Sequence, residues 1–185
     1  MKFRKVLAVL LFLGMSGSAA VWADDVYSEN VAQAVHAFLG KYIEGGDKVF
    51  TFDKARGIFR GTLSSKGEVR LLGFQIEIGN AHFISYFISP IGADPGDTAK
   101  MSRLAEFICR ANYGMLNGNF ELDFSDGEIR YKSFVDCSGE CVPSEEVIGN
   151  SLWVGLNMFN RYLPGIKDML FSDVIPKDAV EKCRK

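Results

Sequence analysis

The sequence predicts an α+β fold, in which an antiparallel sheet of about five strands packs one apolar face against helices. Three observations support this class. Apolar residues recur at helical spacing in three separate segments. Between those segments the apolar pattern changes to a period of two, and two pairs of alternating runs are joined by short glycine-containing turns. The expected element order is therefore α-β-β-β-α-β-β-α.

The first 23 residues have the pattern of an export signal. Basic residues precede an uncharged apolar run, Val6–Met15, and small residues then lead to Ala23 before two aspartates. The run is too short to span a bilayer comfortably, and no later segment has the ~18 apolar residues that a span needs. We expect cleavage after Ala23 and a periplasmic or secreted chain without a stable membrane span. The alternative is an uncleaved membrane anchor.

The rest of the chain, residues 24–185, shows no repeat or linker and is expected to form one domain with a short C-terminal tail from about residue 173. Its first element is a helix capped by Ser28 and ended by Gly45 and Gly46. The residues expected to form its buried stripe are Val31, Ala34, Val35, Phe38 and Tyr42.

Four runs with a period of two follow, at 49–52, 57–63, 69–78 and 81–88, of which 69–78 and 81–88 are the clearer strands; the expected element order counts three strands here. Gly79 and Asn80 fit a two-residue type II′ turn, which places Leu72 opposite Phe87 and Glu77 opposite His82. One face of this hairpin is then almost wholly apolar. The other face is polar near the turn and apolar at its far end.

That second face carries four apolar residues where a one-sided sheet should be polar: Leu71, Ile84, Tyr86 and Ile88. One explanation is cover by residues 49–52 or by the tail. The other is a surface for a dimer or a partner protein, in which Tyr86 would be the anchor. The sequence leaves both open.

A second helix is expected after Asp97 or Thr98, and its buried stripe comprises Met101, Leu104, Ile108, Ala111 and Met115. A second hairpin follows. Asp126-Gly127 is typical of a type I′ turn, and a two-residue turn places Asp123 opposite Arg130 and Glu121 opposite Lys132. Opposite charges would then face each other across the strands.

A third helix is expected to open at 143–146, with a break or kink at Pro164, followed by a short polar helical tail from residue 176.

Part of the chain resembles a known protein family. The residues that carry the resemblance are Asn112, the segments 118–123 and 126–132, and the long third helix. The family that they resemble is the YbjN family, whose members are described as bacterial sensory transduction regulators. The resemblance covers roughly residues 50–171. It implies a fold like that of type III secretion chaperones, and a non-enzymatic, regulatory or chaperone-like protein that binds other proteins.

Four cysteines in an exported chain favour disulfides. We expect Cys137–Cys141, which would pin a short turn, together with Cys109–Cys183, which would tie down the tail. Free thiols are the first alternative. Redox or metal chemistry is the second, although the spacing C-x-x-x-C is not that of a thioredoxin-like motif.

No catalytic, cofactor-binding or metal-binding residues are expected. The formal net charge of -2 argues against nucleic-acid binding, and the two histidines are few for a metal site. His82 opposite Glu77 is interpreted as an exposed cross-strand pair rather than as a catalytic base. The expected partner is another protein, either a different chain or a second copy. A carrier of a small apolar ligand, held between sheet and helices, is the alternative function.

Overall fold

The computed structural model describes residues 27–43, 50–64, 71–139 and 141–185, so the expected export signal and Gly45-Gly46 lie outside the described residues. The elements follow one another in the order α1 (Glu29–Ile43), β1 (Phe50–Asp53), β2 (Ile58–Ser64), β3 (Leu71–Ile78), β4 (His82–Ile88), α2 (Thr98–Asn112), β5 (Asn119–Leu122), β6 (Ile129–Asp136), α3 (Glu145–Phe171) and α4 (Pro176–Arg184).

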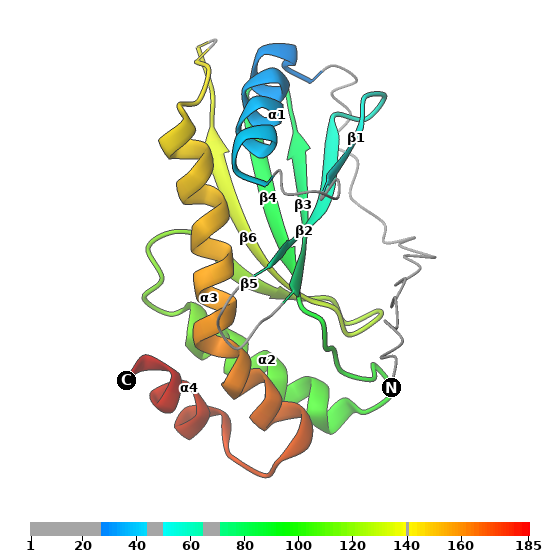
Figure 1. The fold of residues 1–185 in the computed structure, drawn as a ribbon. Helices are drawn as coiled ribbons and strands as arrows, with labels where there is room; N and C mark the ends of the chain where they lie inside the picture. Colours follow the sequence, from blue (N-terminus) through cyan, green and yellow to red (C-terminus); the bar gives the residue numbers. More distant parts are fainter. Residues whose placement is uncertain (1–26, 44–49, 65–70, 140) are drawn as a thin grey trace, which may run out of the picture.

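The six strands form one antiparallel sheet in the order β1-β2-β3-β4-β6-β5 (Figure 1). This confirms the α+β class, with one strand more than the expected number. The pairing of β4 with β6 joins the two hairpins across helix α2. That neighbourhood is set by tertiary structure, and no local sequence pattern reveals it.

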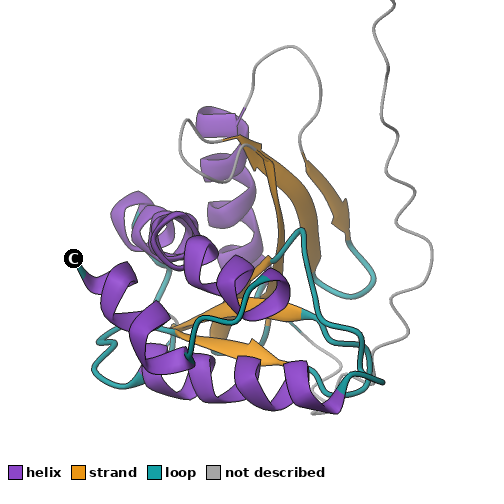
Figure 2. Ribbon diagram, turned by 90° about the horizontal axis from the view of Figure 1, so that it is seen from below, coloured by secondary structure: helices purple, strands orange, loops and turns teal. Residues whose placement is uncertain are grey.

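Helices α1 and α3 lie against the same face of the sheet (Figures 1 and 2). Alternate strand residues point toward them and are fully buried, because successive side chains of a strand point to opposite faces. The largest are Phe59, Leu72, Ile76, Phe83, Phe87, Phe120, Ile129 and Tyr131. Helix α3 comes so close to β4 that a Cβ on Gly155 would lie 2.2 Å from Cδ2 of Phe87.

The helix starts agree with the sequence. The Ser28 hydroxyl accepts a hydrogen bond from the Val31 amide, and the Asp97 carboxylate accepts one from the Lys100 amide at 3.0 Å. The second bond holds the pKa of Asp97 below its usual value. Helix α3 continues past Pro164 to Phe171, so of the two expected outcomes, a break or a kink, the break does not occur.

The C-terminal tail is a docked helix. Ala179 and Val180 of α4 are buried, and the Arg161 guanidinium on α3 donates to the carbonyl of Cys183 at 3.0 Å. The short apolar face of α4 therefore completes the core at the end of the molecule where α2 and α3 meet.

The predicted register of the first hairpin is wrong by two residues. Phe74 pairs with Phe87, and Ile78 pairs with Phe83. The turn is Asn80-Ala81 rather than Gly79-Asn80, since the Gly79 amide donates to the His82 carbonyl at 2.8 Å. An even shift leaves every side chain on its predicted face.

The second hairpin shows the same error. Glu121 lies opposite Arg130, and a four-residue loop, 124–127, replaces the expected two-residue turn. Phe124 falls in that loop and is exposed. Gly127 has a φ of 76°, and a Cβ there would lie 1.8 Å from the Ala93 carbonyl oxygen. The glycine is therefore needed for a tight contact between two loops as well as for the turn.

Candidate functional site

No described helix covers the second face of the sheet (Figures 1 and 2), which we call the open sheet face. Its side chains alternate along the strands with the buried ones. The open sheet face is formed by Ile58, Arg60, Leu71, Gln75, Glu77, Ile84, Tyr86, Ile88, Glu121, Arg130, Lys132 and Phe134.

The four apolar residues singled out in the sequence all lie on this face, but they are unequally exposed. Leu71 is 52% exposed, and Ile84 and Ile88 are half-buried. Tyr86 is only 8% exposed. It stands between Ile84 and Ile88 on β4, so the four do not form one continuous apolar patch.

Tyr86 is therefore little exposed, and its role as the anchor of a partner surface stays a prediction. The Arg130 guanidinium lies over its ring, with the central carbon 4.4 Å from the ring centroid. Gln75 and Lys132 flank Tyr86 on the neighbouring strands. Burial raises the pKa of Tyr86 to about 12, with a further contribution from Glu77 that Arg130 opposes. This phenol is a neutral, covered member of the face.

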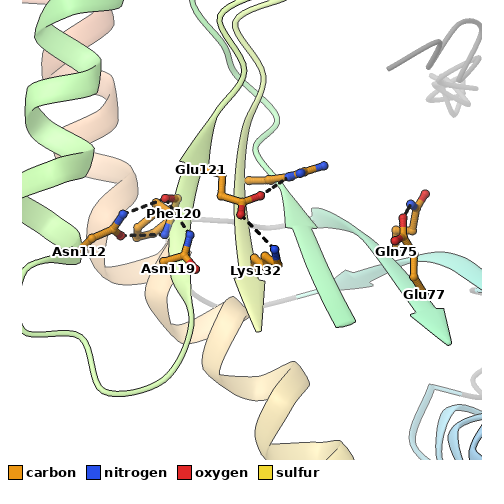
Figure 3. A network of polar contacts seen from close by, with 8 residues as sticks. Gln75, Glu77, Asn112, Asn119, Phe120, Glu121 and Lys132 are labelled. Atoms are coloured by element: carbon orange, nitrogen blue, oxygen red, sulfur yellow. Dashed lines mark hydrogen bonds and ion pairs between the residues drawn. The ribbon is translucent and has the colours of Figure 1, made fainter. Parts of the chain in front are cut away.

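Glu121 fixes the position of Arg130. Its carboxylate accepts a hydrogen bond from Arg130 Nε at 2.7 Å, and Lys132 Nζ lies 3.5 Å away on the same carboxylate (Figure 3). Burial disfavours the charge on Arg130, but the bond to Glu121 raises the pKa of the guanidinium overall. Such partly exposed pairs contribute ~1 kcal/mol or less each, so their main effect is to orient Arg130 over the ring.

A second polar row crosses β2 and β3. Arg60 Nε donates to Gln75 Oε1 at 2.8 Å, and Gln75 Nε2 donates to Glu77 Oε1 at 2.6 Å, as Figure 3 shows for Gln75 and Glu77. The open sheet face therefore carries both signs of charge in fixed positions.

Phe134 is the residue of this face that the sequence analysis missed. It is 55% exposed and lies directly opposite Ile84. Its ring stacks on His82 with centroids 5.3 Å apart, and His82 lies opposite Asp136 rather than the predicted Glu77. The alternation of Arg130, Lys132 and Phe134 could have placed Phe134 on the face, but not beside Ile84.

Asn112 connects helix α2 to the edge of the sheet beside this face. Its Nδ2 donates to the Phe120 carbonyl at 2.9 Å, and its Oδ1 accepts from the Phe120 amide at 2.8 Å (Figure 3). Asn112 thus satisfies the amide and the carbonyl of Phe120, the two backbone groups of the edge strand β5 that point away from β6. The residue that follows Phe120 is Glu121, so this contact also helps to position the charged part of the open sheet face.

The cysteines are free thiols in this structure, so neither expected bridge is shown. Cys137 is buried and Cys141 is exposed, whereas Cys109 lies exposed on α2. Burial, and then the neighbouring Cys141, raise the pKa of Cys137, and burial also raises the pKa of Cys183. Raised pKa values disfavour the reactive thiolate. The Cys137–Cys141 and Cys109–Cys183 pairs stay predictions for the oxidised protein.

The space between sheet and helices is filled by aromatic rings. Phe120 contacts Tyr131, Phe159 and Tyr162 edge to face. A hollow of about 500 Å³ lies on the surface beside α3 rather than between the layers. The structure therefore gives no support to a carrier of an apolar ligand at that place. Within the described ranges, no helix is long and apolar enough to cross a membrane, and no three His, Cys, Asp or Glu side chains gather as metal ligands.

These features define an α+β protein with a six-stranded antiparallel sheet, one face of which no described helix covers. No family model and no curated protein matches the chain. Among solved structures, the chain is similar to one chain of the "Structure of the HopA1-SchA Chaperone-Effector Complex", with 10% sequence identity and a TM-score of 0.46 over 71% of this chain and 92% of that chain.

Proposed function

We propose that this protein is exported and binds another polypeptide through the open sheet face, in a regulatory or chaperone-like role. The observation that carries the proposal is Phe134, a large aromatic side chain that is 55% exposed beside half-buried Ile84. Glu77 lies opposite Ile84 on β3, and Lys132 lies two residues from Phe134 on β6, so a charge of each sign flanks this pair. Aromatic residues and arginine are enriched where protein partners meet, within a polar rim.

The energetic argument starts from the area left to cover. A phenylalanine side chain buries ~150–250 Å², so a half-exposed ring leaves about 100 Å² to a partner. At ~25 cal/mol per Å² this corresponds to roughly 2–3 kcal/mol of apolar stabilisation. One such ring, with Ile84 beside it, is enough for the centre of a small interface.

Two parts of the proposal rest on the sequence. Export rests on the leader pattern of residues 1–23, and sequencing the N-terminus of protein recovered outside the cytoplasm should give Asp24 as the first residue. Membership of the YbjN family rests on the resemblance around Asn112 and the second hairpin. In the structure Asn112 holds β5 in place, which gives this residue of the resemblance a structural role beside the open sheet face.

Photo-crosslinking tests the proposed surface. The photoreactive analogue p-benzoylphenylalanine replaces Phe134 in one variant and, in the controls, Phe124 or Phe171, which are 61% and 74% exposed away from this face. We expect a polypeptide adduct from position 134 that neither control gives. The adduct should be lost when Ile84→Thr is added, a change that keeps a β-branched side chain but removes apolar area.

The mass of the adduct identifies the kind of partner. An adduct of twice the chain mass assigns the face to a second copy, and any other mass assigns it to a different protein. Equal adducts from all three positions, or none from position 134, would exclude the open sheet face as the binding surface.

A further inference from the structure

The loop after α2 runs beside α3 on the helical side of the molecule (Figure 1). A surface groove is lined by residues of this loop, of α3 and of the end of α4. Its volume is about 500 Å³. Tyr113 and Leu116 on the loop are 84% and 103% exposed, so two large apolar side chains stand in solvent at its rim. We call it the α3 groove; its main lining residues are Tyr113, Met115, Leu116, Val154, Met158, Arg161 and Arg184.

The floor of the groove continues along α3. Val147, Val154 and Met158 are spaced by seven and four residues, which places them on one side of a helix. Val147 is 41% exposed beyond the hollow, toward the start of α3, and polar Asn150 and Ser151 separate it from Val154. Arg161 follows Met158 by three residues and ends the row with a positive charge.

Arg161 and Arg184 bring two cations to that end. Arg161 donates from Nε and Nη2 to the carbonyls of Cys183 and Arg184, at 3.0 and 3.2 Å. Arg184 donates from Nη2 to the carbonyls of Arg110 and Tyr113, at 2.8 and 2.9 Å. These bonds hold the two side chains in place.

The same bonds leave N–H groups of both guanidiniums unused, because each guanidinium has five. Neither Arg161 nor Arg184 has a carboxylate partner in the part of the chain that the structure describes. The chain as a whole carries a formal charge of -2. An uncompensated positive pair at the end of an apolar row is therefore a local departure from the general charge of the protein.

We propose that the α3 groove binds an amphipathic, acidic helix of a partner protein. Apolar side chains of that helix, at spacings of three and four residues, would pack between Leu116 and the row on α3. A carboxylate at one end would pair with Arg161 and Arg184, because arginine binds carboxylates through two parallel hydrogen bonds. The site lies on the helical side of the sheet and does not depend on the open sheet face.

A synthetic helix tests this proposal. The probe is a fluorescein-labelled peptide of about 16 residues, long enough for the row on α3. It carries leucines at spacings of three and four and glutamates at both ends, and a matched peptide carries glutamine in their place. Fluorescence anisotropy with the full mature chain should show the glutamate peptide binding about tenfold more tightly or better, with a preference that weakens as salt is added.

Variants locate the site. Leu116→Asp changes a fully exposed side chain and should weaken binding by about tenfold or more, because it removes an apolar contact and repels the glutamates. Phe124→Asp, at an exposed position outside the groove, should bind as the wild type does. Arg161→Gln should abolish the preference for glutamate, and Arg161→Lys should restore part of it.

Three results would overturn the proposal. The first is equal or absent binding of the two peptides, and the second is binding that Leu116→Asp leaves unchanged. The third is that the protein, without any peptide, interacts through Leu116 with something else. Adsorption to phosphatidylglycerol vesicles that Leu116→Asp abolishes would assign the groove to a membrane surface. A concentration-dependent increase in mass by light scattering would assign it to a second copy.

Discussion

The contact between Asn112 and β5 gives a quantitative prediction. Asn112→Ala removes both hydrogen bonds to the Phe120 backbone, at 2.8 and 2.9 Å. Each bond contributes a net ~0.5–1.5 kcal/mol, so the free energy of unfolding should fall by about 1–3 kcal/mol. The better helix propensity of alanine offsets only a few tenths of a kcal/mol.

Urea unfolding followed by circular dichroism measures this loss, and the melting temperature should fall by about 2–4 °C for each kcal/mol. Asn112→Asp should be at least as harmful, because a carboxylate oxygen would replace the amide donor that faces the Phe120 carbonyl. The matched control is Asn119→Ala, which removes a longer bond of 3.3 Å to the same carbonyl and should have a smaller effect. If Asn112→Ala unfolds at the same urea concentration as Asn119→Ala, the reasoning is refuted.

Three further predictions concern the core, the thiols and the tyrosines. Gly155→Ala should lower the free energy of unfolding, measured in urea, by about 1–3 kcal/mol, because the new Cβ would lie 2.2 Å from Phe87. The control is Gly40→Ala, which should not destabilise the fold because a Cβ there has nothing within 4 Å. Equal effects of the two changes would contradict the packing of α3 on β4. In the reduced protein, timed alkylation and mass spectrometry should show exposed Cys141 reacting before buried Cys137, and mild oxidation should link the two in one peptide pair; faster modification of Cys137 would contradict its raised pKa. Burial raises the pKa of Tyr86 and of Tyr131 from 10.0 to about 12, so the folded state holds their protons more tightly than the unfolded state does. The free energy of unfolding should therefore be constant below pH 10 and fall as the pH rises from about 10 to 12. Tyr86→Phe should make that fall less steep, and an unchanged slope would contradict the burial of Tyr86.

The faces of the strands could be predicted from the sequence, but the registers could not. Gly79 and Gly127 both indicate turns, and both mark other constraints as well. A Cβ on Gly79 would lie 2.5 Å from Cε1 of His82, and Gly127 packs against the Ala93 backbone. Local turn preferences therefore predict strand registers two residues away from those that tertiary contacts select. Since the side-chain period is two, the assignment of Leu72 to the core was unaffected.

The residues of the open sheet face could be predicted only in part, for a related reason. Leu71, Ile84 and Ile88 share one hairpin, so alternation alone places them on one face. Arg130 and Phe134 reach that face because β6 pairs with β4 across the intervening helix. This long-range pairing places Arg130 over Tyr86 and Phe134 beside Ile84, so the proposed surface centres on Phe134 rather than on Tyr86.

The open sheet face as a polypeptide-binding surface is tested most directly by one matched pair of variants, Phe134→Glu and Phe124→Glu. The two positions are 55% and 61% exposed, so neither change should alter the fold, and equal melting temperatures would verify this. Each variant is used as bait in an affinity capture from material outside the cytoplasm, and the captured polypeptides are compared by isotope-labelled mass spectrometry. The mass of each variant by light scattering measures self-association. We expect Phe134→Glu to reduce the captured polypeptide or the dimer by about tenfold or more, as loss of a central aromatic contact requires, while Phe124→Glu behaves as the wild type. Equal capture and equal mass for both variants would contradict the account.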